Sequence, residues 1–368
     1  MGRVLRIVGI VVGLLIALII TLSLALPLFI NPNDYKDKIT SLVKEQTGRT
    51  LTIAGNIGLS VFPWLGLEVN KVQLSNAPGF GDQPFARVGE VDIRVKLLPL
   101  VLHRKVEMST VTLNGLQLDL ARNRQGRTNW QDLIKPAPAA KAPATPQKTA
   151  PAPGGSAIAG LAIGGVKVRD ARLVWDDAQA GTRYALQDLS LTTGAIEPGK
   201  PFDLAFKARF EGGKPQVSGD ISLDGKVWTS QSLQQAKLEG LHVVLQAKGA
   251  NLPAAGLKAD LKTQAAIDLA KQTLQVSALT LQAAGLTVHG DLNGTGIGGP
   301  KASFSGTFKT DEFVPREVMA NLGQSVPKTA DPSVLAKAQA SAKLQASDTD
   351  ARVSDLKLRL DDSTVTGA

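Results

Sequence analysis

The sequence predicts a mainly β protein: an N-terminal transmembrane helix, then an elongated, curved antiparallel β-sheet that forms a repeating groove, with a few short helices. Three observations support this prediction. Residues 7–30 form one long, uncharged, apolar segment. After Gly48, apolar and polar residues alternate with a period of two, which is typical of strands with one wet face. Helical segments of about 10–15 residues, which would separate the strands of a βαβ fold, are absent.

The N-terminal segment is long enough to cross a bilayer. As a helix, residues 7–30 would extend about 36 Å, which exceeds the roughly 30 Å of the hydrocarbon core. A cleaved signal peptide is the alternative, because Ser23 and Ala25 place small residues at the spacing of a cleavage site. The apolar region of a signal peptide has only about 7–15 residues, so the length favours a retained anchor. Basic residues flank the segment on both sides and do not orient it.

A short amphipathic helix is predicted directly after the anchor. Asn31 or Asn33 is a suitable N-cap, Pro32 suits the first turn and Gly48 marks the end. The helix either packs on the end of the following sheet, which we favour, or lies on the bilayer surface. Its predicted apolar face consists of Tyr35, Ile39, Leu42 and Val43.

The alternating runs give candidate positions that face the groove. In the first half of the chain these positions are Leu65, Leu67, Val69, Val91, Ile93, Val95, Leu97, Val111, Leu113, Leu116, Leu118, Leu120, Val166 and Val168. In the second half they are Leu204, Phe206, Phe210, Leu241, Val243, Leu245, Leu279, Leu281, Leu356 and Leu358. Turn residues such as Asn114-Gly115 separate the runs.

The chain divides by composition into four parts. Residues 1–31 contain the anchor, and residues 32–135 contain the amphipathic helix and a first groove unit. Residues 136–157 are rich in proline and alanine, and we expect them to form a disordered linker. Residues 158–368 continue the groove. An insertion within one continuous sheet is the alternative interpretation of the linker.

The second half contains an internal repeat. Leu279-x-Leu281 followed by Val288-x-Gly290 recurs 77 residues later as Leu356-x-Leu358 followed by Val365-x-Gly367. Such repetition predicts strand units stacked along one axis. Between the copies, near residues 311–340, we expect one helix over 315–322 and a second that starts at Asp331-Pro332. The second copy stops one residue after its glycine, from which we expect the chain to be truncated.

The composition and the scarcity of reactive motifs argue against an enzyme. The chain has no cysteine, and its three histidines, His103, His242 and His289, have no partner at metal-ligand spacing. We therefore expect no catalytic residues, no metal and no cofactor. Asp176-Asp177 and Asp361-Asp362 are interpreted as solvated carboxylates in turns. The net charge is +9, but the basic residues are scattered singly, which argues against nucleic-acid binding.

The predicted helices are too few to cover the apolar face of so many strands. Two solutions remain open: two sheets that close on each other as a sandwich, or one curled sheet whose apolar face holds a hydrophobic ligand. A ribbon lined by leucine, valine and isoleucine suits acyl chains.

Several motifs occur together and resemble those of the AsmA family over nearly the whole chain apart from the linker. They are Gly48-Arg49-Thr50-Leu51 with Ile53 and Gly55, Leu59-Ser60-Val61-Phe62-Pro63-Trp64-Leu65-Gly66-Leu67, Asn76-Ala77-Pro78-Gly79-Phe80, Val111-x-Leu113-x-Gly115, Arg122-Asn123-x-x-Gly126-x-x-Asn129-Trp130, and Pro315 to Gly323. We interpret Phe62-Pro63-Trp64 and Asn129-Trp130 as structural, a rigid turn and a packed tryptophan at a strand end.

The resemblance implies a single-pass anchor in the bacterial inner membrane, with the bulk of the chain in the periplasm and a role in outer-membrane integrity and biogenesis. AsmA-like proteins are similar to bridge-like lipid-transfer proteins, so the implied partners are phospholipids. Outer-membrane or periplasmic proteins are further candidate partners. A scaffold for outer-membrane protein assembly, with a closed sandwich core, is the alternative.

Overall fold

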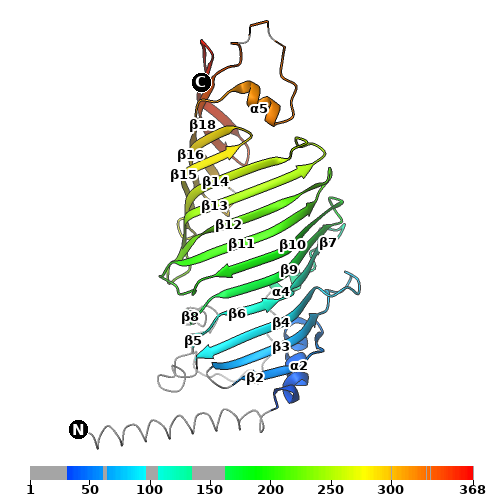
Figure 1. Ribbon diagram of the computed structural model, residues 1–368. Coiled ribbons are helices and arrows are strands. Elements are labelled where there is room, and N and C mark those ends of the chain that lie inside the picture. The colour runs from blue at the N-terminus through cyan, green and yellow to red at the C-terminus, as the bar shows by residue number, and fades with distance from the viewer. Residues whose placement is uncertain are drawn as a thin grey trace, which may run out of the picture. The chain divides into compact units, whose positions relative to one another are not determined.

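The computed structural model describes residues 31–60, 64–96, 107–134, 162–299, 301–328, 330–331 and 333–367, and it is mainly β (Figure 1). The predicted anchor, the linker over 136–157, Leu97 and His103 lie outside these residues. None of the helices within the described part is both long and apolar enough to span a membrane. The chain divides into two compact units, Met1–Gly181 and Thr182–Ala368, which are described separately.

Unit 1 begins with the predicted amphipathic helix. A 3-10 turn, η1 (Pro32–Tyr35), leads into α2 (Lys36–Thr47), and a further short helix, α4 (Gln131–Ile134), lies after the strands. Asn31 caps η1, and Gly48 ends α2 with a left-handed φ of 72°, a conformation that glycine adopts readily. Only part of the predicted apolar face packs, because Tyr35 is 54% exposed and Leu42 48% exposed.

The sheet of unit 1 is mixed. Its strands are β1 (Leu51–Ile53), β2 (Ile57–Ser60), β3 (Trp64–Leu74), β4 (Ala86–Lys96), β5 (Glu107–Met108), β6 (Val111–Asn114), β7 (Gln117–Arg122), β8 (Ala162–Ile163) and β9 (Val166–Asp177). β3 pairs antiparallel with β1, β2 and β4, whereas β8 is parallel to β5, and β9 is parallel to both β6 and β7.

The prediction of a purely antiparallel sheet is therefore wrong in unit 1. Parallel neighbours need a crossover connection of about a dozen residues or more. The segment between β7 and β8 contains residues 136–157 and supplies that length. Because β7 and β9 pair with each other, the proline- and alanine-rich segment connects strands of one sheet.

Unit 2 is an antiparallel meander, as predicted. Its strands are β10 (Thr182–Thr193), β11 (Phe202–Gly212), β12 (Val217–Thr229), β13 (Gln235–Gly249), β14 (Leu257–Asp268), β15 (Thr273–Ala283), β16 (Leu286–Thr295), β17 (Ser303–Thr310), β18 (Ala338–Ser347), β19 (Ala351–Leu360) and β20 (Ser363–Gly367). Each strand pairs antiparallel with the next in sequence.

One of the two helices predicted between the repeat copies is present. α5 (Pro315–Asn321) forms between β17 and β18, and Gly323 follows it with a φ of 71°. The second helix, expected from Asp331, is wrong: residues 333–335 form a turn. Asp331 Oδ1 accepts hydrogen bonds from the backbone N and the hydroxyl of Ser333, at 2.8 and 2.7 Å. Such local side-chain bonds offer the backbone an alternative to a helix.

Several strands of unit 2 contain a β-bulge at a residue with left-handed φ. The bulged residues are Asp188, Gly240, Ala278 and Asp355, with φ between 50° and 58°. At each bulge the register with a neighbouring strand shifts. Ala278 and Asp355 occupy equivalent positions in the 77-residue repeat. The hairpins that follow them also share a register, because Leu279 pairs with Gly290 and Leu356 with Gly367.

Candidate functional site: the apolar face of the sheet

Rows of apolar residues cross the sheet of unit 2 from strand to strand, and we call the side they share the apolar face. Directly paired residues point to the same side of a sheet. One row, across β11 to β19, consists of Phe202, Val227, Leu238, Ala265, Val276, Leu292, Gly306, Leu344 and Val353. A second row, across β10 to β16, consists of Leu191, Phe206, Leu223, Val243, Leu261, Leu281 and Val288.

The apolar face lacks a covering layer among the described residues. Among the described residues of unit 2, the buried apolar side chains are all alanines: Ala185, Ala208, Ala247 and Ala338. Larger ones stay partly accessible, with Tyr184 at 48%, Leu344 at 40%, Val353 at 51% and Val365 at 54%. All these strands belong to one sheet. A β-sandwich would need a second sheet on the apolar face, and the described part of unit 2 contains one sheet only.

The sequence-predicted groove positions of unit 2 all lie on this face. They alternate along their strands with polar residues and pair with other apolar positions. Leu241 faces Thr263 next to the bulge of β13 and still shares the side of Val243. The role of these residues in binding stays a prediction.

Four of the predicted positions of unit 1 form a similar row together with Ile57, which was not predicted. Ile57, Val69, Val91, Leu113 and Val168 pair in succession across β2, β3, β4, β6 and β9. The two ends of this row are buried, with Ile57 3% and Val168 6% exposed. Two further predicted pairs join β3 to β4 beside this row: Leu65 with Val95, and Leu67 with Ile93. Leu67 is 36% exposed. Leu118 and Leu120 lie opposite Leu173 and Trp175 on β9, and Leu116 precedes β7.

The opposite face of unit 2 is polar, and its charged side chains bind one another. His242, predicted to face solvent, lies between Asp224 at 3.6 Å and Asp260 at 3.0 Å and is 33% exposed. The hydrogen bond with His242 holds the pKa of Asp260 below its usual value. The described residues include no cluster of three histidine or carboxylate groups that could hold a metal ion.

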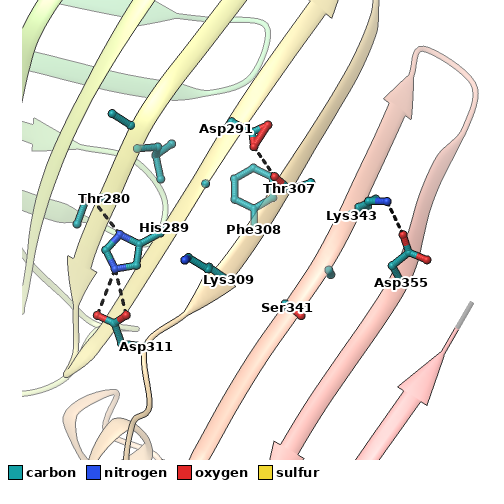
Figure 2. Close-up of a pocket in the computed structure, with 14 residues that line it drawn as sticks. Thr280, His289, Asp291, Thr307, Phe308, Lys309, Asp311, Ser341, Lys343 and Asp355 are labelled. Atoms are coloured by element: carbon teal, nitrogen blue, oxygen red, sulfur yellow. Dashed lines mark hydrogen bonds and ion pairs between the residues drawn. The ribbon is translucent and has the colours of Figure 1, made fainter.

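A hollow of about 690 Å³ is lined by residues from β15 to β19 (Figure 2). Its lining includes His289 and Lys343 from the polar rows, and Leu279 and Phe308 from the apolar rows. Figure 2 shows His289 between Thr280 at 3.1 Å and the carboxylate of Asp311 at 3.2 Å. The nearby Lys343 and Asp355 form an ion pair at 2.7 Å. Asp311 is 62% exposed, so water competes for its carboxylate. We interpret these contacts as cross-strand links on a hydrated surface.

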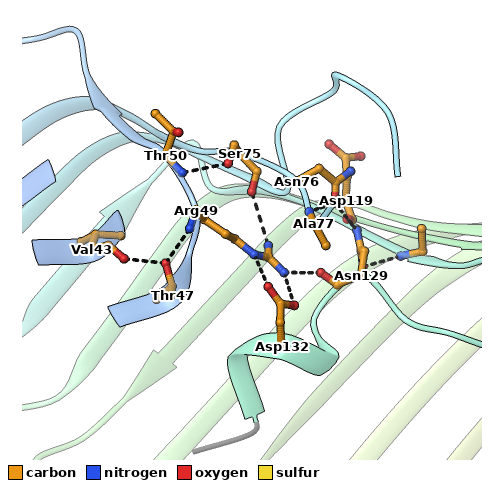
Figure 3. Close-up of polar contacts among 11 residues, drawn as sticks. Val43, Thr47, Arg49, Thr50, Ser75, Asn76, Ala77, Asp119, Asn129 and Asp132 are labelled. Carbon is orange, nitrogen blue, oxygen red and sulfur yellow. Dashed lines mark hydrogen bonds and ion pairs between the residues drawn. The ribbon is translucent and has the colours of Figure 1, made fainter. Parts of the chain in front are cut away.

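Three residues from the motifs that carried the family resemblance, Arg49, Asn76 and Asn129, meet in one buried polar cluster of unit 1 (Figure 3). Arg49 is 1% exposed and donates to both carboxylate oxygens of Asp132, at 2.8 and 2.6 Å. It also donates to the backbone carbonyls of Asn129 and Ser75. Its guanidinium lies 4.6 Å from the centre of the Phe85 ring. The bond from Arg49 holds the pKa of Asp132 below its usual value.

Asn129 extends this cluster, and its side chain is fully buried. It accepts from the backbone N of Ala121 at 2.8 Å, and it donates to Asn76 Oδ1 at 3.0 Å and to the carbonyl of Asp119 at 2.8 Å. The next residue, Trp130, packs on Trp175 with 5.3 Å between ring centres. Asn129-Trp130 thus has the structural role predicted for it. Of the other such motif, Phe62 and Pro63 lie outside the described residues.

Two carboxylates differ from the sequence-based interpretation. Asp177, expected in a solvated turn, ends β9, is 4% exposed and binds Arg122 and the backbone N of Gln179 and Ala180. The bond from Arg122 lowers the pKa of Asp177. Asp361 does lie in a turn, but its carboxylate accepts three backbone N–H groups, from residues 335–337. Local sequence offered no signal for either set of partners.

Comparisons with known proteins agree with the resemblance. A model of the AsmA family matches residues 1–368 of this chain. Protein AsmA of Escherichia coli (strain K12) is 26% identical over 269 residues, which cover 72% of this chain and 40% of that protein. The chain thus spans less than half the length of that relative. No solved structure matches.

Proposed function

This chain belongs to the AsmA family, and on that premise we propose that its apolar face holds the acyl chains of phospholipids and carries them from the inner toward the outer membrane. The observation that supports the proposal is the continuous, uncovered apolar face of unit 2. Residues 7–30 would anchor the chain in the inner membrane, with the remaining residues in the periplasm. A contribution to outer-membrane integrity would follow from the lipid supply.

The chemistry of the face favours acyl chains over a polar ligand. The backbone groups of the strands are occupied by the ladders on either side, so the face offers apolar side chains and almost no hydrogen-bonding groups. Burying one methylene group contributes about 0.8 kcal/mol. About six methylenes in contact with the rows would therefore contribute about 5 kcal/mol relative to exposure of the same groups to water.

A site-specific crosslinking experiment tests this proposal. A photoreactive amino acid replaces either Leu281 or Gln282 in the full chain, expressed in Gram-negative cells. These neighbours lie on opposite faces of β15, Leu281 half-buried and Gln282 exposed. We expect phospholipid on Leu281 after irradiation and little on Gln282. Equal yields at both positions, or none at Leu281, would refute lipid binding on this face.

Charged substitutions separate the proposal from the scaffold alternative. Leu281→Lys introduces a charge into the middle of an apolar row, whereas Gln282→Lys introduces the same charge on the wet face. If the apolar face holds lipid, Leu281→Lys leaves the chain folded and removes bound phospholipid, measured by mass spectrometry of the purified chain. If the chain is a scaffold for protein assembly, neither substitution changes a lipid signal, because none exists.

A further inference from the structure

Aromatic rings lie against glycines on the apolar face. Gly294 on β16 pairs with Phe304 on β17, and Gly290 pairs with Phe308. A Cβ atom at Gly294 would lie 3.0 Å from Phe304 Cε1, and one at Gly290 would lie 2.5 Å from Phe308 Cδ1. Such distances mean that each ring leans across the neighbouring strand, over the position where a side chain would otherwise stand.

The same arrangement recurs elsewhere in unit 2. A Cβ at Gly219 on β12 would lie 2.8 Å from Cζ of its partner Phe210. A ring that lies over a glycine presents its flat side to the ligand, whereas a ring pushed up by a side chain would project from the sheet. At these three pairs, the glycine therefore lets the phenylalanine ring lie close to the backbone of the sheet.

Gly294 allows this effect to be isolated. The three atoms nearest to a Cβ there are all side-chain atoms, two on Phe304 and Cγ2 of Ile297 at 3.2 Å. A Cβ atom at Gly290 would lie 2.7 Å from the backbone oxygen of Thr307, and one at Gly306 would lie 2.3 Å from the backbone oxygen of Asp291. Any side chain at these two positions would therefore distort the sheet. A methyl group at Gly294 can be accommodated by lifting the Phe304 ring.

We propose that the pairing of Phe304 with Gly294, and of Phe308 with Gly290, sets the clearance for acyl chains where they cross β16 and β17. These glycines then determine how closely an acyl chain can approach the sheet. The inference rests on the proposed function, because it assigns a role to these residues in that same lipid path. It predicts that lifting one ring obstructs the path locally and leaves binding elsewhere on the face intact.

The test uses photocrosslinking at two positions of the full chain. Leu292 lies on β16, two residues before Gly294, and Leu261 lies on β14. With Gly294→Ala, we expect the phospholipid yield at Leu292 to fall several-fold and the yield at Leu261 to stay unchanged. Phe304→Ala, added to Gly294→Ala, should restore the yield at Leu292 because no ring is left to lift.

Matched controls separate clearance from folding and from the proposed function. Gly367→Ala adds a methyl group on the same face, where the nearest atom, Leu356 Cβ, is at an ordinary 3.6 Å, and should change nothing. Phe304→Trp enlarges the ring and leaves Gly294 unsubstituted. It should lower the yield at Leu292, which keeps the test valid if Gly294→Ala does not fold. An unchanged yield in both folded variants, or no rescue by Phe304→Ala, overturns the inference. If no phospholipid crosslinks at position 261 in a chain that keeps Gly294 and Phe304, the proposed function is refuted instead.

Discussion

Replacing Arg49 should destabilise unit 1 more than any other single charge removal in its polar cluster. In Arg49→Ala, the carbonyl of Asn129 loses a donor next to a side chain that is fully buried. Leaving a buried acceptor without a donor lowers the free energy of unfolding by about 1–3 kcal/mol. The contact with the Phe85 ring adds about 0.5–2 kcal/mol. Asp132, which is 37% exposed, regains water and so contributes little further loss.

We therefore expect Arg49→Ala to lower the free energy of unfolding by about 3 kcal/mol, the low end of the range for removing one partner of a buried ion pair. Arg49→Lys keeps the charge but cannot bind both oxygens of Asp132 in a planar fork, and we expect about half that loss. The control is Arg94→Ala, because Arg94 is 51% exposed in its pair with Asp92 and such pairs contribute about 0–1 kcal/mol.

Urea denaturation followed by tryptophan fluorescence measures these differences, because Trp130, next to Asn129 in the chain, packs on Trp175. With a slope of about 2 kcal/mol per molar urea, a 3 kcal/mol loss moves the midpoint by about 1.5 M. The reasoning is refuted if Arg49→Ala loses less than about 1 kcal/mol, or no more than Arg94→Ala. Either result would mean that water or a rearranged side chain satisfies Asn129.

Three further predictions concern a bulge, a carboxylate and the lipid. Ala278→Gly relieves a left-handed φ of 51° and should raise the free energy of unfolding by about 0.5–1 kcal/mol. Ala265→Gly on β14, where φ is not left-handed, should lower it by a similar amount; urea titration of both variants checks this. Because the pKa of Asp177 is lowered on folding, its stabilising effect is present above the unfolded pKa of about 3.9 and is lost as pH falls through the folded pKa. The urea midpoints of Asp177→Asn and the unsubstituted chain should thus differ at pH 7 and converge in acid. Stripping bound phospholipid should lower the melting temperature, and adding phospholipid vesicles should restore it; a calorimetric scan with unchanged temperature would contradict this.

Alternation along the chain predicted which residues share a face, because the period of two is a local property of strands. Leu281, Val243 and Phe206 lie on one face as expected. The bulges were also visible in the sequence: the step from Val276 to Leu279 breaks the alternation by one residue. Such a step, repeated 77 residues later, is a pattern that could have located them.

Contacts between distant residues were beyond local patterns. Asp177 and its partner Arg122 are 55 residues apart in the sequence. Nothing near Trp175 in the sequence indicates that the carboxylate of Asp177 is buried. The parallel pairing of β9 depends on where the chain returns after residues 136–157, which hydrophobic periodicity does not encode. The helix expected at Asp331 failed for a local reason, since capping residues also close turns.

The strictly sequential pairing of β10 to β20 has a consequence for how unit 2 folds and lengthens. Each strand bonds only to the strands before and after it in the chain, so nearly every contact closes a short loop. Low contact order of this kind favours rapid folding that can start at any hairpin and spread to its neighbours. A hairpin added to the end of this series would have to pair with one edge strand of the sheet only. Duplication of a hairpin is therefore tolerated, and the motif over 279–290, which recurs 77 residues later over 356–367, has the form that this kind of growth would leave.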